Sequence, residues 1–165
     1  MIKIVDKNRI PELRQQLKAL DGKKIQVGVF GDAEADLAII AGANEFGANI
    51  PVMEKMRGYL HFIGIHLKKT TKVIKIPERA FLRITMDKKD TISKAVKFAE
   101  RIFDRNQDPN QILDAMGASL VSSVQDTIES NLQPPNSEIT IQRKGSAKTL
   151  QDKGRLKQGI AYKIV

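Results

Sequence analysis

A run of apolar residues spaced four apart constrains the fold of this chain most strongly. Its members are Ile112, Met116, Leu120, Val124, Ile128 and Leu132. This spacing places all of them on one face of an α-helix. Asp108–Asn110 separates the run from the sequence before it, and Pro134 and Pro135 cannot continue a helix. The sequence therefore predicts one long amphipathic helix between Ile112 and Leu132.

Shorter patterns predict the other elements. Apolar residues at helical spacing indicate helices at 11–20, at 32–47 with Asp32 as N-cap, and at 92–103. Alternating apolar residues indicate strands at 23–30 and 159–165, and "ITIQ" (139–142) suggests another short strand. Helices and strands that are segregated along the chain favour an α+β fold over a doubly wound sheet.

A predicted β-hairpin occupies about 57–76. Two β-rich runs, Gly58–Leu67 and Lys72–Ile76, flank a polar turn at Lys68–Thr71. Apolar and β-branched runs around a short polar turn are typical of hairpins. The expected fold is thus a small antiparallel sheet with a long β-hairpin, packed against several α-helices.

Positive charge is concentrated in two segments. The chain has 165 residues and a net charge of +9. Residues 54–75 and 143–157 each contain six basic residues and one acidic residue, so the remainder is nearly neutral. Residues 133–158 are also poor in large apolar groups, which predicts mobility in the free protein. We expect an α+β core over 1–132 and a polar, basic, mobile extension over 133–165 that ends in a strand.

Composition excludes several classes of protein. There is no cysteine, hence no disulfide or thiolate metal site, and no run approaches the ~18 apolar residues of a transmembrane helix. The first residues lack the apolar region of a secretory signal, which predicts a product made in the cytoplasm. His61 and His66 lie at odd spacing in the expected strand, on opposite faces, so we predict no shared metal site.

No pattern of an enzyme site is present either. No serine lies in a G-x-S-x-G motif, and the acidic pairs Glu34/Asp36 and Asp87/Asp90 fall at expected helix starts, where they stabilise the helix dipole. The turn at Gly28–Asp36 lacks the Lys-Ser/Thr of a P-loop and the third glycine of a dinucleotide fingerprint. We predict no catalytic residue, cofactor or metal.

The basic segments leave three interpretations open. Lysine and arginine on exposed segments can neutralise phosphates without reading base sequence. They can equally be solvated surface charge or contact acidic protein surfaces. With aromatic residues at only 5% and no tryptophan, stacking platforms for bases are scarce.

Three fragments, taken in order, resemble a known family. They are "AGANEFG" (Ala41–Gly47), "IPERAFLR" (Ile76–Arg83) and "KTLQDKGRLKQGIAYKIV" (Lys148–Val165). The arrangement resembles tail-completion and head–tail joining proteins of long-tailed bacteriophages and prophages, in which E-F-G ends a helix, I-P-x-R-P-F-L-R follows a strand, and L-x-D-T-G-x-L precedes a final strand. Ala80, Lys153 and Gly159 depart from that pattern, where proline, threonine and serine are usual.

The resemblance implies a non-enzymatic virion protein, made in the cytoplasm of the host bacterium. It would form a homo-oligomeric ring, with six copies as a candidate number, at the head-proximal tail end or neck. There it would contact tail-tube and connector proteins, with non-specific DNA contact in the lumen as a candidate and no membrane partner. Completing the tail, joining it to the head and terminating the tube stay open, and so does non-specific nucleic-acid binding.

The candidate residues form two groups. Interface or lumen candidates are Arg79, Arg83, Lys68, Lys69, Lys72, Lys75, Lys148, Lys153, Arg155 and Lys157. Structural-motif candidates are Glu45, Phe46, Gly47, Pro77, Phe81, Leu82, Gly154 and Leu156. We expect Phe81 and Leu82 to enter the core. For Arg79 and Arg83 a local role and an interface role both remain, and Glu78 is a candidate local partner.

Overall fold

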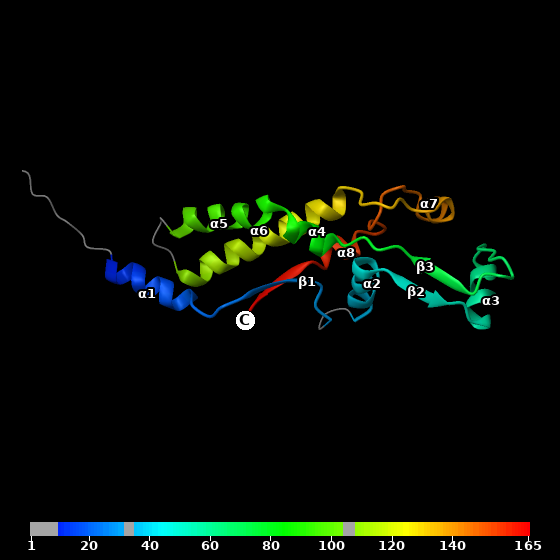
Figure 1. Ribbon diagram of the computed structural model, residues 1–165, viewed down its shortest axis with the longest axis horizontal. Coiled ribbons are helices and arrows are strands. Elements are labelled where there is room, and N and C mark those ends of the chain that lie inside the picture. Colours follow the sequence, from blue (N-terminus) through cyan, green and yellow to red (C-terminus); the bar gives the residue numbers. More distant parts are fainter. Residues whose placement is uncertain (1–9, 32–34, 104–107) are drawn as a thin grey trace, which may run out of the picture.

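A computed structural model describes residues 10–31, 35–103 and 108–165 of the chain (Figure 1). The elements, in order, are α1 (Ile10–Leu20), β1 (Ile25–Gly28), α2 (Ala35–Phe46), β2 (Ala48–Pro51), α3 (Glu54–Phe62), β3 (Val73–Ile76), α4 (Phe81–Asp87), α5 (Lys89–Phe103), α6 (Pro109–Glu129), α7 (Glu138–Lys144), α8 (Arg155–Gln158) and β4 (Ala161–Ile164). The α+β prediction is confirmed. The predicted N-cap Asp32, together with Glu34, lies outside the described residues.

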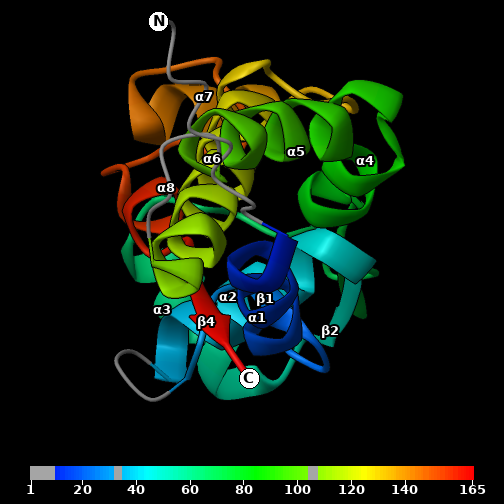
Figure 2. The same cartoon turned by 90° about the vertical axis from the view of Figure 1, so that its left-hand side faces the viewer.

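The predicted long helix is α6, and the rest of the body is built around it. Asp108 caps its start by accepting a hydrogen bond from the Asn110 N–H, with Pro109 in the first turn. The helix contacts α1, α4, α5 and both strands of one sheet. Figure 2 shows α4, α5 and α6 on one side of the molecule, and α2 and the sheets on the other. Leu132 lies beyond the helix end but still packs on the core.

The sheet that packs on α6 joins the two distant ends of the sequence. β1 pairs antiparallel with β4, with Val27 opposite Tyr162. Tyr162 lies directly over Gly117 of α6, where any Cβ would overlap the ring. Its hydroxyl donates to Asp114 Oδ1 at 3.1 Å. The predicted strands at 23–30 and 159–165 are therefore confirmed, as β1 and β4. Gly117 allows helix and sheet to approach closely.

The core lies where α2, α4, α6 and the C-terminal segment meet. Its buried members are Leu37, Ala41, Phe81, Val124, Ile128, Leu156 and Ile160, and Leu82 packs against them. Phe81 has no exposed surface. The prediction that Phe81 and Leu82 enter the core is confirmed.

Residues 48–76 form an arm that projects from the body at the end opposite α1 (Figure 1). β2 pairs antiparallel with β3, with Ile50 opposite Ile74, and α3 connects them. No residue of the arm is buried. β3 ends at Ile76, opposite Ala48 of β2, and Pro77 follows it.

The predicted hairpin is correct in its second run and wrong in its first. Lys72–Ile76 contains β3, but Gly58–Leu67 begins as the helix α3 and continues as a loop. Met56, Leu60 and Ile63, the residue that follows the helix, recur at helical spacing and are half-buried. A short apolar run carries both periods, and here the helical one prevails.

Residues 133–165 contain α7, α8 and β4. The suggested strand at 139–142 is wrong, because the segment is the helix α7. Ser137 accepts a hydrogen bond from the Thr140 N–H, and Gly145 ends the helix in the left-handed conformation. These caps outweigh the β-branched residues between them. Leu156 and Ile160 of this segment are core residues. Its mobility stays a prediction.

Candidate functional site

The first two sequence motifs are joined by a helix cap. Glu45 is buried near the end of α2, and its two carboxylate oxygens accept the N–H groups of Leu82 and Arg83, each at 2.9 Å. These groups belong to the first turn of α4, where backbone donors have no helical partner. A carboxylate there also complements the positive end of the helix dipole. Glu45 therefore fixes α4 against α2.

Gly47 allows the chain to turn beside this cap. Its φ is +72°, and a Cβ would lie 3.2 Å from the Glu78 nitrogen and from the Ile76 oxygen. Nearby, the Arg79 N–H donates to the Asn44 carbonyl at 2.7 Å. The E-F-G motif and the I-P-E-R motif are thus one packed unit, although thirty or so positions separate them in sequence.

Arg79 holds the start of the C-terminal segment. Its side chain is buried, with Nε donating to the Pro134 carbonyl at 2.8 Å. Its Nη2 donates to the Pro135 carbonyl at 3.2 Å and to Asn136 Oδ1 at 3.4 Å. Burial lowers the pKa of this guanidinium from its usual value. Arg79 therefore has a local role, whereas Arg83 is exposed and forms an ion pair with Glu78.

The third motif is fixed to the same unit. Thr149 is fully buried and donates its N–H to Asn131 Oδ1 at 2.7 Å. Leu156 enters the core from α8, which follows Gly154, a residue with a φ of +76°. Gly159 lies against Leu37 of α2 so closely that a side chain would overlap it. The serine that is usual in the resembling family would not fit here without a shift of Leu37.

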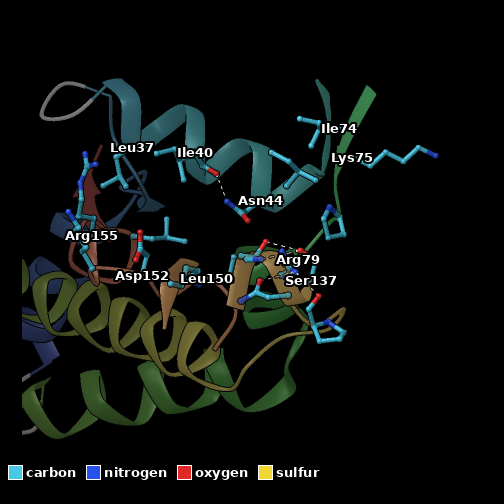
Figure 3. Close-up of a pocket in the computed structure, with 18 residues that line it drawn as sticks. Leu37, Ile40, Asn44, Ile74, Lys75, Arg79, Ser137, Leu150, Asp152 and Arg155 are labelled. Atoms are coloured by element: carbon cyan, nitrogen blue, oxygen red, sulfur yellow. Dashed lines mark hydrogen bonds between the residues drawn. The ribbon is translucent and has the colours of Figure 1, made fainter. Parts of the chain in front are cut away.

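The three motifs surround a groove of ≈ 690 Å³ (Figure 3). In Figure 3, Leu37, Ile40 and Asn44 of α2 lie along one side, and Arg79, Ser137, Leu150 and Asp152 along the other. Ile74 and Lys75, at the base of the arm, close one end of the groove. Half-buried or exposed apolar side chains from all of these parts (Ile40, Ile74, Ile76 and Leu150) line it.

The groove collects basic residues from both charged segments. Five basic side chains line it, against one carboxylate, that of Asp152; they are Lys75, Arg79, Lys144, Lys153 and Arg155. The other candidates lie elsewhere. Lys148 is exposed, and Lys157 forms an ion pair with Glu129, whose pKa this hydrogen bond lowers. Lys68, Lys69 and Lys72 are exposed on the arm.

The arm presents large apolar side chains to solvent. Phe62 is 87% exposed and Phe46, at the base of the arm, 76%. Met53 and Tyr59 are also exposed. Arg57 holds the basic loop against α3 by donating to the carbonyls of Lys68 at 3.0 Å and Thr71 at 2.7 Å. The sequence did not reveal this role, because Arg57 resembled any other basic residue of the segment.

The two histidines differ from their predicted placement. His61 lies in α3 and His66 in the following loop, and their ring centroids are 4.6 Å apart. The expectation of opposite strand faces was wrong because the segment is not a strand. Across the described ranges no group of three or more residues suited to a metal ion occurs. Nor is any described helix long and apolar enough to cross a bilayer.

Comparisons with protein-family models, with curated proteins and with solved structures found no match.

Proposed function

We propose that the chain is a structural subunit of a long-tailed phage or prophage virion. It would assemble with copies of itself into a ring at the head-proximal tail end or neck, completing the tail or joining it to the head. This role needs no catalytic residue or cofactor. The phage setting rests on the resemblance of the three sequence fragments.

The observation that carries the assembly role is the exposed apolar arm. No residue of 48–76 is buried, and three of its large apolar side chains, those of Met53, Tyr59 and Phe62, are exposed to solvent. Short helices are marginally stable without packing, and exposed aromatic clusters are typical of interaction surfaces. A neighbouring subunit that covered α3 would remove this apolar surface from water. Contact between the arm of one copy and another part of the next is heterologous and can close a ring.

The convergence of the three motifs lends further support. Residues that are far apart in sequence meet in one cap, one buried arginine and one glycine contact. The three motifs therefore belong to a single packed unit of the structure, although they are far apart along the chain. A packed body of this kind offers a rigid base for a projecting arm.

The test of self-assembly compares the arm with the body. The double variant Tyr59→Ser, Phe62→Ser should remain a folded monomer and lose ring formation, measured by light scattering and electron microscopy. Ile84→Ser, at an exposed residue of α4, is the matched control and should still assemble. Rings formed equally well by both variants would contradict the role of the arm.

Particles made without the protein would separate the tail roles. Full heads beside finished tails would support joining, and overlong tubes would support a terminator. Charge reversal of Lys68, Lys69, Lys72 and Lys75 tests whether the basic arm contributes, since we expect it to disrupt ring formation or joining. Unchanged assembly would show that these lysines do not contribute to the interface.

Non-specific nucleic-acid binding is the second candidate, favoured by the exposed lysines of the arm. It predicts binding to duplex DNA that falls steeply as salt rises, because each neutralised phosphate releases counterions. Binding that is weak at low salt, or insensitive to salt, would reject it.

A further inference from the structure

The groove between α2 and residues 135–156 meets the arm only at its base, where Ile74, Lys75 and Ile76 line it, and does not include the exposed residues Tyr59 and Phe62 of α3. Its apolar lining comes from α2, β3 and the C-terminal segment, and its volume is within the range of natural ligand sites. The proposed ring role assigns nothing to it.

Arg79 gives the groove an unusual charge. All three of its side-chain hydrogen bonds go to neutral oxygens, those of Pro134, Pro135 and Asn136. No described carboxylate forms an ion pair with it, and its Nη1 donates to no described residue. Buried charges in proteins are ordinarily paired. The guanidinium therefore lines the groove as a cation that still has donors for an anionic group.

The side chains around Arg79 define the chemistry that a ligand of the groove would need. Lys144 and Lys153 line the same groove, with Asp152 as the one carboxylate among its lining residues. Lys144 donates to the Lys148 carbonyl, which leaves its charge without an acidic partner among the described residues. Alongside these cations, Ile40, Ile74 and Leu150 offer apolar surface. A complementary ligand thus carries carboxylates and apolar side chains together.

We propose that this groove binds a short acidic and apolar segment of a partner protein. The Arg79 guanidinium holds a partner carboxylate, Lys144 and Lys153 attract its acidic neighbours, and Ile40, Ile74 and Leu150 cover its apolar side chains. Guanidinium suits this role because its planar donors match carboxylate oxygens. The inference does not depend on the phage setting or on ring formation.

Two other occupants fit less well. The arm of a second copy carries a net charge of +5 over residues 54–75, so a groove with five basic residues repels it. Nucleic acid would supply phosphates, but a phosphate backbone has no apolar side chains to cover Ile40 and Leu150. A protein segment supplies both components.

The test uses the full chain and a labelled peptide in which glutamate and leucine alternate. Fluorescence anisotropy measures its binding, and the same peptide with glutamine in place of glutamate is the first control. Ile40→Asp and Lys153→Glu should each weaken binding about tenfold or more, since each changes a lining residue. Their matched controls, Ile39→Asp on the same helix and Lys69→Glu on the arm, should bind like the unchanged chain.

Arg79→Lys adds a variant that keeps the positive charge and removes the planar donors. It should weaken the glutamate peptide and leave the glutamine peptide unaffected. Because Arg79 also holds residues 134–136, the fold of the Arg79→Lys variant must be checked by circular dichroism. If it does not fold, Ile40→Asp and Lys153→Glu still decide the matter.

Several outcomes would overturn the proposal. They are failure of the glutamate peptide to bind, equal binding of the glutamine peptide, and equal losses in groove and control variants. Competition by duplex DNA that is lost in Lys153→Glu and kept in Lys69→Glu would instead assign the groove to nucleic acid. The Tyr59→Ser, Phe62→Ser variant changes no lining residue of the groove. Loss of rings with intact peptide binding in this variant would separate this proposal from the proposed function.

Discussion

The described residues form two antiparallel sheets of the same size, and these sheets have different surroundings. β1 and β4 form one, and β2 and β3 the other, with four residues in each strand. The first packs on α6, with Tyr162 against Gly117. The second stands in the arm, where α3 contributes no buried residue. Two-stranded sheets are marginal alone, so only the first has its stabilising partner within the described chain.

This difference separates residues that stabilise the body from residues that are available to partners. In the body, apolar side chains such as Phe81 are removed from water and polar groups such as Glu45 are satisfied. In the arm, the side chain of Phe62 is exposed to water. This is notable because aromatic residues make up only 5% of the chain, and most of the burial that each could provide is not used here. Substitutions in the body should therefore lower the free energy of unfolding, and substitutions in the arm should change assembly.

The largest expected effect is that of Phe81→Ala. The ring is fully buried in the core, so its removal should lower the free energy of unfolding by ~3–5 kcal/mol. Thermal and denaturant unfolding measure this loss. A melting temperature close to that of the unchanged chain would contradict the expectation that burial makes body residues more important for stability than arm residues.

A smaller loss is expected from Glu45→Ala. Two backbone donors of α4 would lose their buried charged acceptor, which should cost ~1.5–3 kcal/mol in denaturant unfolding. Glu78→Ala removes a carboxylate that lies close in space but is exposed, and its ion pair with Arg83 contributes ~0–1 kcal/mol. Equal losses in the two variants would contradict the capping role of Glu45.

The packed sheet can be disturbed through Gly117→Ala. The new methyl group would overlap the Tyr162 ring, and overpacking of this kind costs ~1–3 kcal/mol. Gly42→Ala in α2 is the matched control, because a Cβ there has no neighbour within 4 Å. It should stabilise the helix by ~0.5–1 kcal/mol. A neutral Gly117→Ala variant would show that the sheet does not need this close approach.

The smallest effect on folding is expected from Phe62→Ser in the arm. The side chain is 87% exposed, so the free energy of unfolding of the monomer should change by no more than ~0.5 kcal/mol. Ring formation, if it uses this surface, should weaken in the same variant. A large loss of monomer stability would mean that Phe62 has a structural role within the arm.

The helices with long apolar patterns were predictable from sequence because their signals are local. The α6 pattern and its Asp108–Pro109 start appear directly in the letters, as do the terminal strands. The errors at α3 and α7 occur where short apolar or β-branched runs are compatible with both a helix and a strand. At α7 the caps at Ser137 and Gly145 favour the helix. Of the groove, sequence indicated the basic residues but not Ile40 or Leu150, which come together only through folding.

Sequence by itself determined the long central helix, the absence of cysteine and the two charged segments, since these depend on residue type and spacing alone. Tertiary structure decided which charges are exposed and which are buried. Arg79 and Arg83 look equivalent in the sequence, yet one is buried against residues 134–136 and the other is exposed beside Glu78. Burial and partner geometry arise from contacts between distant segments, and no local pattern encodes them.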